Sequence, residues 1–166
     1  MTLGVLALQG DFAAHSKAFG AAEVRTAREI DALDRLILPG GESTTMRKLL
    51  EGSGIEEAVR RLLDRGGWLF GTCAGAILLA REVLNPPQPS WNPLDITIER
   101  NAYGRQVDSF ESPLGPFIRA PRIRRVGRDV EVLEKFDGEP VLVRQGRVLA
   151  ATYHPELAER PVLPLA

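Results

Sequence analysis

The sequence predicts an α/β fold with three layers, in which a mostly parallel central sheet carries helices on both faces. Short apolar segments alternate with helical segments through the first half of the chain. The first of them, Leu3 to Leu8, is nearly unbroken, as expected for a strand that is covered on both faces. The length of 166 residues and a hydrophobic content of 44% indicate one domain, residues 1–166, with a substantial core.

The first elements follow from this alternation. The strand Leu3 to Leu8 ends at the loop Gln9-Gly10-Asp11, which leads into a helix from Phe12 to about Ala21. A short second strand is expected at Glu23 to Ala27 and a third, buried one at Leu36 to Leu38.

The next helices have recognisable ends. Pro39-Gly40-Gly41 breaks the third strand, and the polar run Glu42 to Thr45 begins a helix. Ser53 and Glu56 form a capping-box pattern ahead of apolar residues that share one helical face. Gly66-Gly67 ends that helix and precedes a fourth strand.

The second half of the chain is richer in strands. Asn85 to Ser90 is a turn-rich connector, and apolar and polar residues then alternate from Leu94 to Glu99, which indicates a half-exposed strand. Further strands, joined by hairpin turns, are expected at Val130 to Phe136, Val141 to Arg144 and Val148 to Tyr153.

Bulk properties exclude several classes of function. The 21 Lys and Arg balance 22 Asp and Glu, so no net charge attracts nucleic acid or a membrane surface, and no apolar run approaches the roughly 20 residues of a membrane span. A single Cys excludes an internal disulfide and fits the reducing cytoplasm. A lone Cys and two His also argue against a metal centre, and we expect neither metal nor cofactor.

That single cysteine, Cys73, lies in Gly71-Thr72-Cys73-Ala74-Gly75, between one short apolar run and a second with helical character. The pattern is typical of a strand–nucleophile–helix turn, where small neighbours permit a sharp elbow. The N-terminus of the following helix favours the thiolate, which is the nucleophilic form. The alternative is a small apolar core residue, since free Cys is often buried. The elbow context favours the nucleophile.

A partner for this thiol is predicted at the end of the last strand, in Tyr153-His154-Pro155-Glu156. Sites in open α/β sheets gather at the carboxyl ends of strands, so His154 can meet Cys73 there. The imidazole would hold the thiolate and protonate the leaving amine, and Glu156 would orient the ring through its other nitrogen. Alone, each would more often be a surface residue; together they predict a Cys–His–Glu triad.

Two backbone amides complete the predicted chemistry. The glycines of Pro39-Gly40-Gly41 let N–H groups point into the site, as an oxyanion hole requires, and we expect Gly41 to provide one donor. The amide of Ala74, next after the nucleophile, would be the second. A plain turn is the alternative for the two glycines.

These motifs resemble those of the class I (triad) glutamine amidotransferases, whose flavodoxin-like fold the resemblance implies. Other segments narrow the resemblance to the glutaminase subunits of pyridoxal 5′-phosphate synthase, and it covers nearly the whole chain. Members of that family usually continue past the His-Pro-Glu motif with a further helix, whereas ten residues follow Glu156 here. The narrowing segments are Leu8 to Asp11, Leu38 to Met46, Glu99 to Glu111 and Phe117 to Pro121.

The resemblance implies that L-glutamine is hydrolysed to glutamate and that the ammonia passes to a β/α-barrel synthase subunit as partner. It implies Cys73, His154 and Glu156 as the triad. Gln9 and His15 are candidates for the partner contact or the site entrance, although His15 is expected on the exposed face of the first helix. The implied glutamine contacts are Gly40, Gly41, Glu42, Arg100, Ile118 and Arg119.

Three other interpretations stay open at this point. The chain could serve another synthase, such as an imidazole glycerol phosphate or anthranilate system, although the Glu99 to Glu111 segment argues against it. It could be an elbow-cysteine hydrolase of the DJ-1/PfpI type, but these commonly place His directly after the Cys, where Ala74 stands here. A scaffold subunit without activity is disfavoured by the intact triad.

Overall fold

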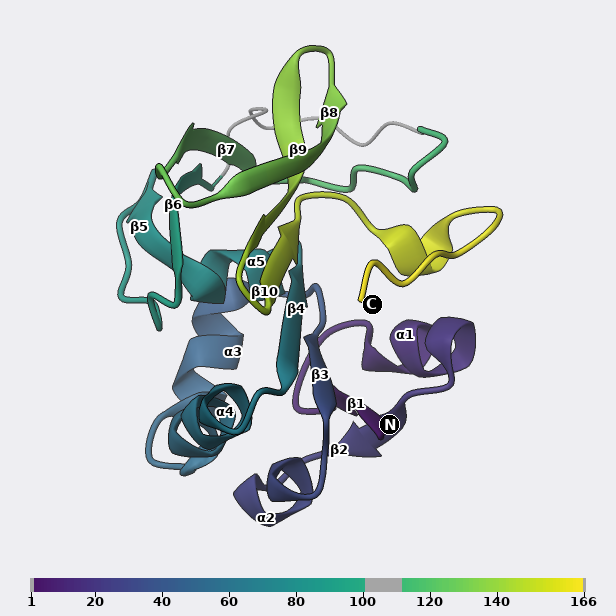
Figure 1. The fold of residues 1–166 in the computed structure, drawn as a ribbon, viewed down its shortest axis with the longest axis vertical. Helices are drawn as coiled ribbons and strands as arrows, with labels where there is room; N and C mark the ends of the chain where they lie inside the picture. Colours follow the sequence, from purple (N-terminus) through teal and green to yellow (C-terminus); the bar gives the residue numbers. More distant parts are fainter. Residues whose placement is uncertain (1, 101–111, 166) are drawn as a thin grey trace.

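Seven strands form the larger of two sheets in this computed structural model, which describes residues 2–100 and 112–165 (Figure 1). Their order is β2-β1-β3-β4-β10-β9-β8. The first five are parallel to one another, while β9 runs antiparallel to both β10 and β8. The structure therefore confirms the predicted α/β fold with a mostly parallel central sheet.

The strands of this sheet are short and bounded by turns. The Asp137-Gly138 turn between β8 and β9 has positive φ at both residues, as a tight hairpin requires. The bounds are β1 Leu3–Leu6, β2 Ala22–Val24, β3 Arg35–Leu38, β4 Trp68–Thr72, β8 Glu131–Phe136, β9 Glu139–Gln145 and β10 Val148–Ala151.

Helices cover both faces of the sheet, in agreement with the predicted three layers (Figure 1). On one face, the apolar sides of α2 (Ala27–Asp31), α3 (Ser43–Leu50), α4 (Ile55–Asp64) and α5 (Ala74–Leu79) enclose the larger core cluster. The other face carries α1 (Phe12–Phe19) and the chain around Phe117 and the C-terminal residues, where Leu163 and Leu165 pack into a second cluster.

A three-stranded sheet stands beside the main one, in the order β5-β6-β7. It contains β5 (Ala80–Leu84), β6 (Leu94–Glu99) and β7 (Arg122–Val126). The alternating pattern predicted β6 correctly as a strand but not its exposure, because Leu94, Ile96, Thr97 and Ile98 are buried and only Asp95 and Glu99 are partly exposed. The segment from Asn101 to Glu111, on which part of the family resemblance rests, lies outside the described residues.

The structure corrects three details of the sequence prediction. Helix α4 begins at Ile55 after Gly54, so Ser53 and Glu56 do not form a capping box; the Ser53 hydroxyl accepts from the Ile55 N–H at 3.2 Å instead. A capping box does form at the N-terminus of α2, between Thr26 and Glu29, and no helix was predicted there. Strands β5 and β7 were also missed.

The parallel register brings the loops that follow four strands to one edge of the sheet. Strands β1, β3, β4 and β10 are consecutive neighbours, so the residues after their carboxyl ends come together. These residues are Asp11 and its loop after β1, Gly40 and Gly41 after β3, Cys73 after β4, and His154 after β10. Within the described ranges, no helix is both long and apolar enough to cross a membrane.

Candidate active site

A pocket of about 510 Å³ opens at this edge of the sheet. Every residue predicted for the triad, the oxyanion hole or the glutamine contacts lines it except Glu156, whose side chain is fully buried behind His154; Gln9 and His15 do not line it. The pocket is lined by Asp11, Gly40, Gly41, Glu42, Ser43, Cys73, Ala74, Ile77, Arg100, Ile118, Arg119, Pro121, His154 and Leu157.

Cys73 occupies the expected elbow between β4 and α5. Its backbone has φ 52° and ψ −107°, a conformation that residues other than glycine rarely adopt, and its N–H donates to the Ala151 carbonyl at 2.9 Å. Close packing of small residues explains why the turn can be so tight: a Cβ at Gly71 would lie 2.6 Å from the Gly75 backbone. The structure therefore supports the reason that the sequence suggested for Gly71 and Gly75, namely that small residues permit a sharp elbow.

His154 is held in place from several sides. Its N–H donates to the Pro116 carbonyl at 2.9 Å, and its ring Nδ1 lies 2.6 Å from Glu156 Oε1. Nδ1 is thus the nitrogen that donates to the carboxyl group, which leaves Nε2 for the Cys73 side chain, its other hydrogen-bond partner. The three residues of the predicted triad are brought together in the order that the sequence indicated.

A second carboxyl group reaches the same ring nitrogen. Asp11 Oδ2 lies 3.3 Å from His154 Nδ1, and Asp11 lines the pocket whereas the Glu156 side chain is fully buried. Asp11 was not among the site residues predicted from the sequence. The signal was available, because Asp11 follows a predicted strand and the carboxyl ends of neighbouring parallel strands converge.

The expectation that His15 lies on an exposed helix face was wrong. Its side chain is completely buried beneath the triad, with Nδ1 3.1 Å from the Asp11 carbonyl and Nε2 3.0 Å from the Thr72 hydroxyl. Nε2 also lies 3.2 Å from Glu156 Oε2. His15 is one helical turn after Asp11, so a helix that places Asp11 at the site places His15 there too.

Burial and charge perturb the ionisation of this group. Burial lowers the pKa of His154, but its hydrogen bonds to Asp11, Cys73 and Glu156 outweigh burial and raise the pKa far above its usual range. Burial and the contact with Asp11 raise the pKa of Glu156 to about 7. Burial would raise the pKa of Asp11, but hydrogen bonds to His154 and Glu156 hold it well below its ordinary value. Burial lowers the pKa of His15, which favours the neutral ring.

The loop after β3 packs directly on the side chains of Cys73 and His154. A Cβ at Gly40 would lie 2.7 Å from His154 Cε1 and 3.4 Å from Cys73 Cβ, so only glycine fits there. The Gly40 carbonyl accepts from the Asp11 N–H at 3.1 Å, and Gln9 Oε1 accepts from the Glu42 N–H at 3.0 Å. Gln9 therefore holds this loop in position. From the sequence, it was expected only at the partner contact or the site entrance.

Charged groups line the outer part of the pocket. The Glu42 carboxylate caps α3 by accepting from the N–H groups of Thr44 and Thr45, at 3.1 and 2.7 Å. Burial would raise its pKa, but these hydrogen bonds lower it. Arg100 donates to the Thr44 hydroxyl at 3.2 Å and lies 3.7 Å from Glu42. The pocket thus presents a carboxylate and, from Arg100 and Arg119, two guanidinium groups.

Comparison with known proteins places the chain in a family. The SNO glutamine amidotransferase family matches residues 5–162. The chain is 54% identical to the pyridoxal 5′-phosphate synthase subunit PdxT of a Thermus thermophilus strain, over 97% of this chain and 93% of that protein. It is 49% identical to the PdxT subunit of Deinococcus radiodurans, over 96% of this chain and 91% of that protein.

Solved structures agree. A crystal structure described as a glutamine amidotransferase superposes with a TM-score of 0.88 at 51% identity, covering 97% of this chain and 94% of that one. PurLQS from Thermotoga maritima superposes with a TM-score of 0.65 at 18% identity, covering 93% and 87%, which shows the shared fold. With a family match over most of its length and relatives near half identity, this chain belongs to the SNO glutamine amidotransferase family.

Proposed function

We propose that this chain is the glutaminase subunit of a pyridoxal 5′-phosphate synthase, and that it hydrolyses L-glutamine to L-glutamate and ammonia for vitamin B6 synthesis. The observation that carries this proposal is the pocket itself. Cys73 and His154 lie at its inner end, with Glu156 behind them. The carboxylate of Glu42 and the guanidinium groups of Arg100 and Arg119 line its outer end.

Those outer charges suit the two ends of an amino acid. Arg100 and Arg119 are placed to bind the α-carboxylate, because a guanidinium pairs with a carboxylate through paired N–H donors, and Glu42 is placed to attract the α-ammonium group. Ile118, with 38% of its surface exposed, provides an apolar side for the substrate methylenes. The side-chain amide of glutamine would then extend toward Cys73.

The chemistry follows from the order of the triad. The Cys73 sulfur attacks the amide carbon, and its proton resides on His154, whose raised pKa suits that role. The oxyanion forms against the N–H groups of Gly41 and Ala74, the latter among the first amides of α5, which have no acceptor within the helix. His154 protonates the departing nitrogen, ammonia leaves, and water then hydrolyses the thioester to release glutamate and restore Cys73.

The partner completes the proposal. Ammonia released into water would be lost, so we propose that a β/α-barrel synthase subunit docks on this chain and receives it. Names of close relatives as synthase subunits support this assignment. A single cysteine without a disulfide partner in the chain fits the reducing cytoplasm, which supports a cytoplasmic location.

The test is direct turnover. Glutamate release from L-glutamine should be measured for the chain mixed with a pyridoxal 5′-phosphate synthase barrel subunit, with Cys73→Ala as the matched control. The proposal expects glutamate and ammonia in equal amounts from the unmodified chain and neither from the variant. Turnover of an unrelated amide or ester, with glutamine left intact, would contradict it.

A further inference from the structure

The carboxyl groups behind the catalytic histidine are crowded in a way that the triad alone does not explain. Nδ1 of His154 lies 2.6 Å from Glu156 Oε1 and 3.3 Å from Asp11 Oδ2, so two carboxyl groups face one nitrogen. The other oxygen of each, Asp11 Oδ1 and Glu156 Oε2, is buried and has no hydrogen-bond partner among the described residues, although His15 Nδ1 lies 3.6 Å from the first and His15 Nε2 3.2 Å from the second. Two ionised carboxylates in that position would repel each other strongly.

His15 closes this group from behind and limits the possible charge states. Its side chain is completely buried, and Nδ1, 3.1 Å from the Asp11 carbonyl, can only donate to it. A neutral ring then carries a lone pair on Nε2. That lone pair can accept from the Thr72 hydroxyl at 3.0 Å, and it also lies 3.2 Å from Glu156 Oε2, a contact that is unfavourable unless the oxygen carries a proton.

We propose that Asp11 and His15 are positioning residues of this triad: Glu156 Oε2 holds one proton that it shares with Asp11 Oδ1, and neutral His15 stabilises that proton from behind. In this proposal the shared proton supplies the hydrogen bond that Asp11 Oδ1 and Glu156 Oε2 otherwise lack. His154 is then oriented by two carboxyl groups that carry a single negative charge between them. This inference rests on the proposed function only for its kinetic test.

The arrangement has a consequence for substitution. If Asp11 or Glu156 alone is replaced by its amide, the remaining carboxyl group ionises and keeps one negative charge on Nδ1. Only replacement of both removes the charge. The proposal therefore predicts that the two substitutions are strongly non-additive, as expected for groups that share one task.

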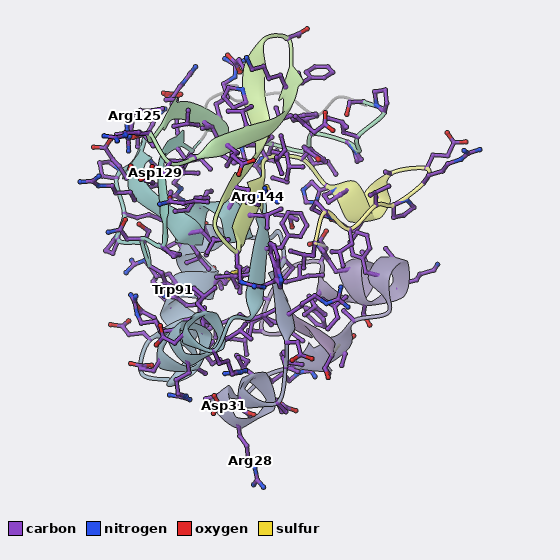
Figure 2. The ribbon with its side chains drawn as sticks, in the orientation of Figure 1. Arg28, Asp31, Trp91, Arg125, Asp129 and Arg144 are labelled. Atoms are coloured by element: carbon purple, nitrogen blue, oxygen red, sulfur yellow. The ribbon has the colours of Figure 1, made fainter. Side chains whose placement is uncertain are left out.

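The kinetic test is a double-mutant cycle for glutamate release with Asp11→Asn, Glu156→Gln and the double variant. Each single substitution should lower kcat about 10-fold, and the double variant on the order of 10³–10⁴-fold, near the loss for a triad whose only carboxylate becomes an amide. A double variant at about 10²-fold, the product of the singles, would overturn the shared charge. Asp129→Asn is the matched control, since Asp129 is exposed and lies far from α1 (Figure 2).

A spectroscopic test does not depend on activity, and it separates failure of this inference from failure of the proposed function. The chain contains two His residues, so ¹⁵N-histidine labelling gives two imidazoles, and His15→Gln identifies which is which. His15 should remain neutral, with its proton on Nδ1, from about pH 6 to pH 8. A doubly protonated His15 in that range would overturn the proposal, because it would favour an ionised Glu156.

A bound cation is the competing explanation, because ligand atoms of Asp11, His15 and Glu156 lie within 4.8 Å of one another. The measurement is the metal content of the purified chain. Substoichiometric metal, with the histidine spectrum unchanged by a chelator, supports the shared proton. One tightly held metal ion per chain, lost in Asp11→Asn, would overturn it.

Discussion

At the scale of single residues, the site depends on a strained backbone at Cys73. A φ of 52° at a residue other than glycine costs about 1–3 kcal/mol and persists where the surrounding structure enforces it. Here the hydrogen bond from its N–H to Ala151 and the close packing of the elbow do so. The strain presents the thiol at the pocket, although the residue is only 8% exposed.

This placement predicts selective labelling. A chloroketone analogue of glutamine should alkylate Cys73 and abolish glutamate release, because the analogue binds as the substrate does and the sulfur is the attacking atom. Mass spectrometry of the intact chain and of its peptides measures the modification. Since Cys73 is the only thiol, labelling of Cys73→Ala at an equal rate would show that another nucleophile reacts.

The triad also predicts unequal losses. His154→Ala should abolish glutamate release nearly as completely as Cys73→Ala, and the double variant should be no worse, because the two residues act as one unit. Glu156→Gln should retain measurable activity. Glu156 orients the His154 ring, at 2.6 Å from Nδ1, and supplies charge, but it does not react with the substrate. Steady-state kinetics of the four variants decide this. Near-normal turnover in His154→Ala would move the base to another residue.

Glu156 predicts a pH dependence of stability. Burial and Asp11 raise the pKa of Glu156 from an ordinary 4.5 to about 7. The protonated carboxyl group therefore stabilises the folded state fully below pH 4.5, and this stabilisation is lost as pH rises through 7. The raised pKa of His154 acts in the same direction. The Tm of Glu156→Gln should therefore rise relative to the unmodified chain between about pH 5 and pH 8. A constant difference in thermal melts would contradict this.

At the scale of elements, the tightness of the elbow makes a prediction for Gly71. A Cβ there would lie 2.6 Å from the backbone of Gly75, which cannot move as a side chain can, so Gly71→Ala should destabilise the fold by about 1–3 kcal/mol and displace Cys73. Denaturant unfolding and glutamate release measure the two effects.

Gly20→Ala is the matched control for this element. Gly20 caps α1 with φ 67°, and a Cβ there meets nothing within 4 Å. The variant should lose about 1–2 kcal/mol from backbone strain and keep its activity. Equal activity in both variants would show that Gly71 serves stability alone.

The elements also show what could be predicted from sequence. The strands and helices around the site were predicted because their apolar runs end in Gly, Pro or polar caps, as at Pro39-Gly40-Gly41. Strand β5 was missed because it follows α5 without a break, at Ala80, and its apolar residues Ala80, Val83 and Leu84 have the spacing of a helix. Helix α2 has only five residues, too few for a periodic pattern, although its capping box was visible in Thr26 and Glu29.

Part of the site could also be predicted from the sequence. Cys73 and His154 each follow a strand in a motif with its own chemistry, so their meeting follows from parallel topology. Asp11 and His15 were not recognised as a pair, because a buried histidine and an exposed one look alike in sequence. Only the packing of α1 against the sheet edge distinguishes them.

At the scale of the whole molecule, the loop after β3 connects the site to the surface. The Gly40–Gly41 peptide is held by the hydrogen bond from the Asp11 N–H to the Gly40 carbonyl, and its far side is exposed at Gly41. Gly41 has φ 155°, and a Cβ there would collide with the Gln9 side chain. Glycine permits a reorientation of this peptide without steric strain, but the rotation breaks the hydrogen bond from the Asp11 N–H. A partner that contacts the loop and offsets that loss can therefore redirect the Gly41 N–H.

This predicts that glutamine hydrolysis depends on the synthase subunit. If docking turns the Gly41 N–H toward the oxyanion, it supplies one donor of the pair, and one such donor changes the rate by about 10²–10³-fold. Glutamate release should be measured for the isolated chain and then with the barrel subunit in excess, with Cys73→Ala as the background. The gain should appear mainly in kcat, because the donor acts on the transition state rather than on bound glutamine. Equal rates with and without the synthase would contradict the coupling and favour a free-standing hydrolase.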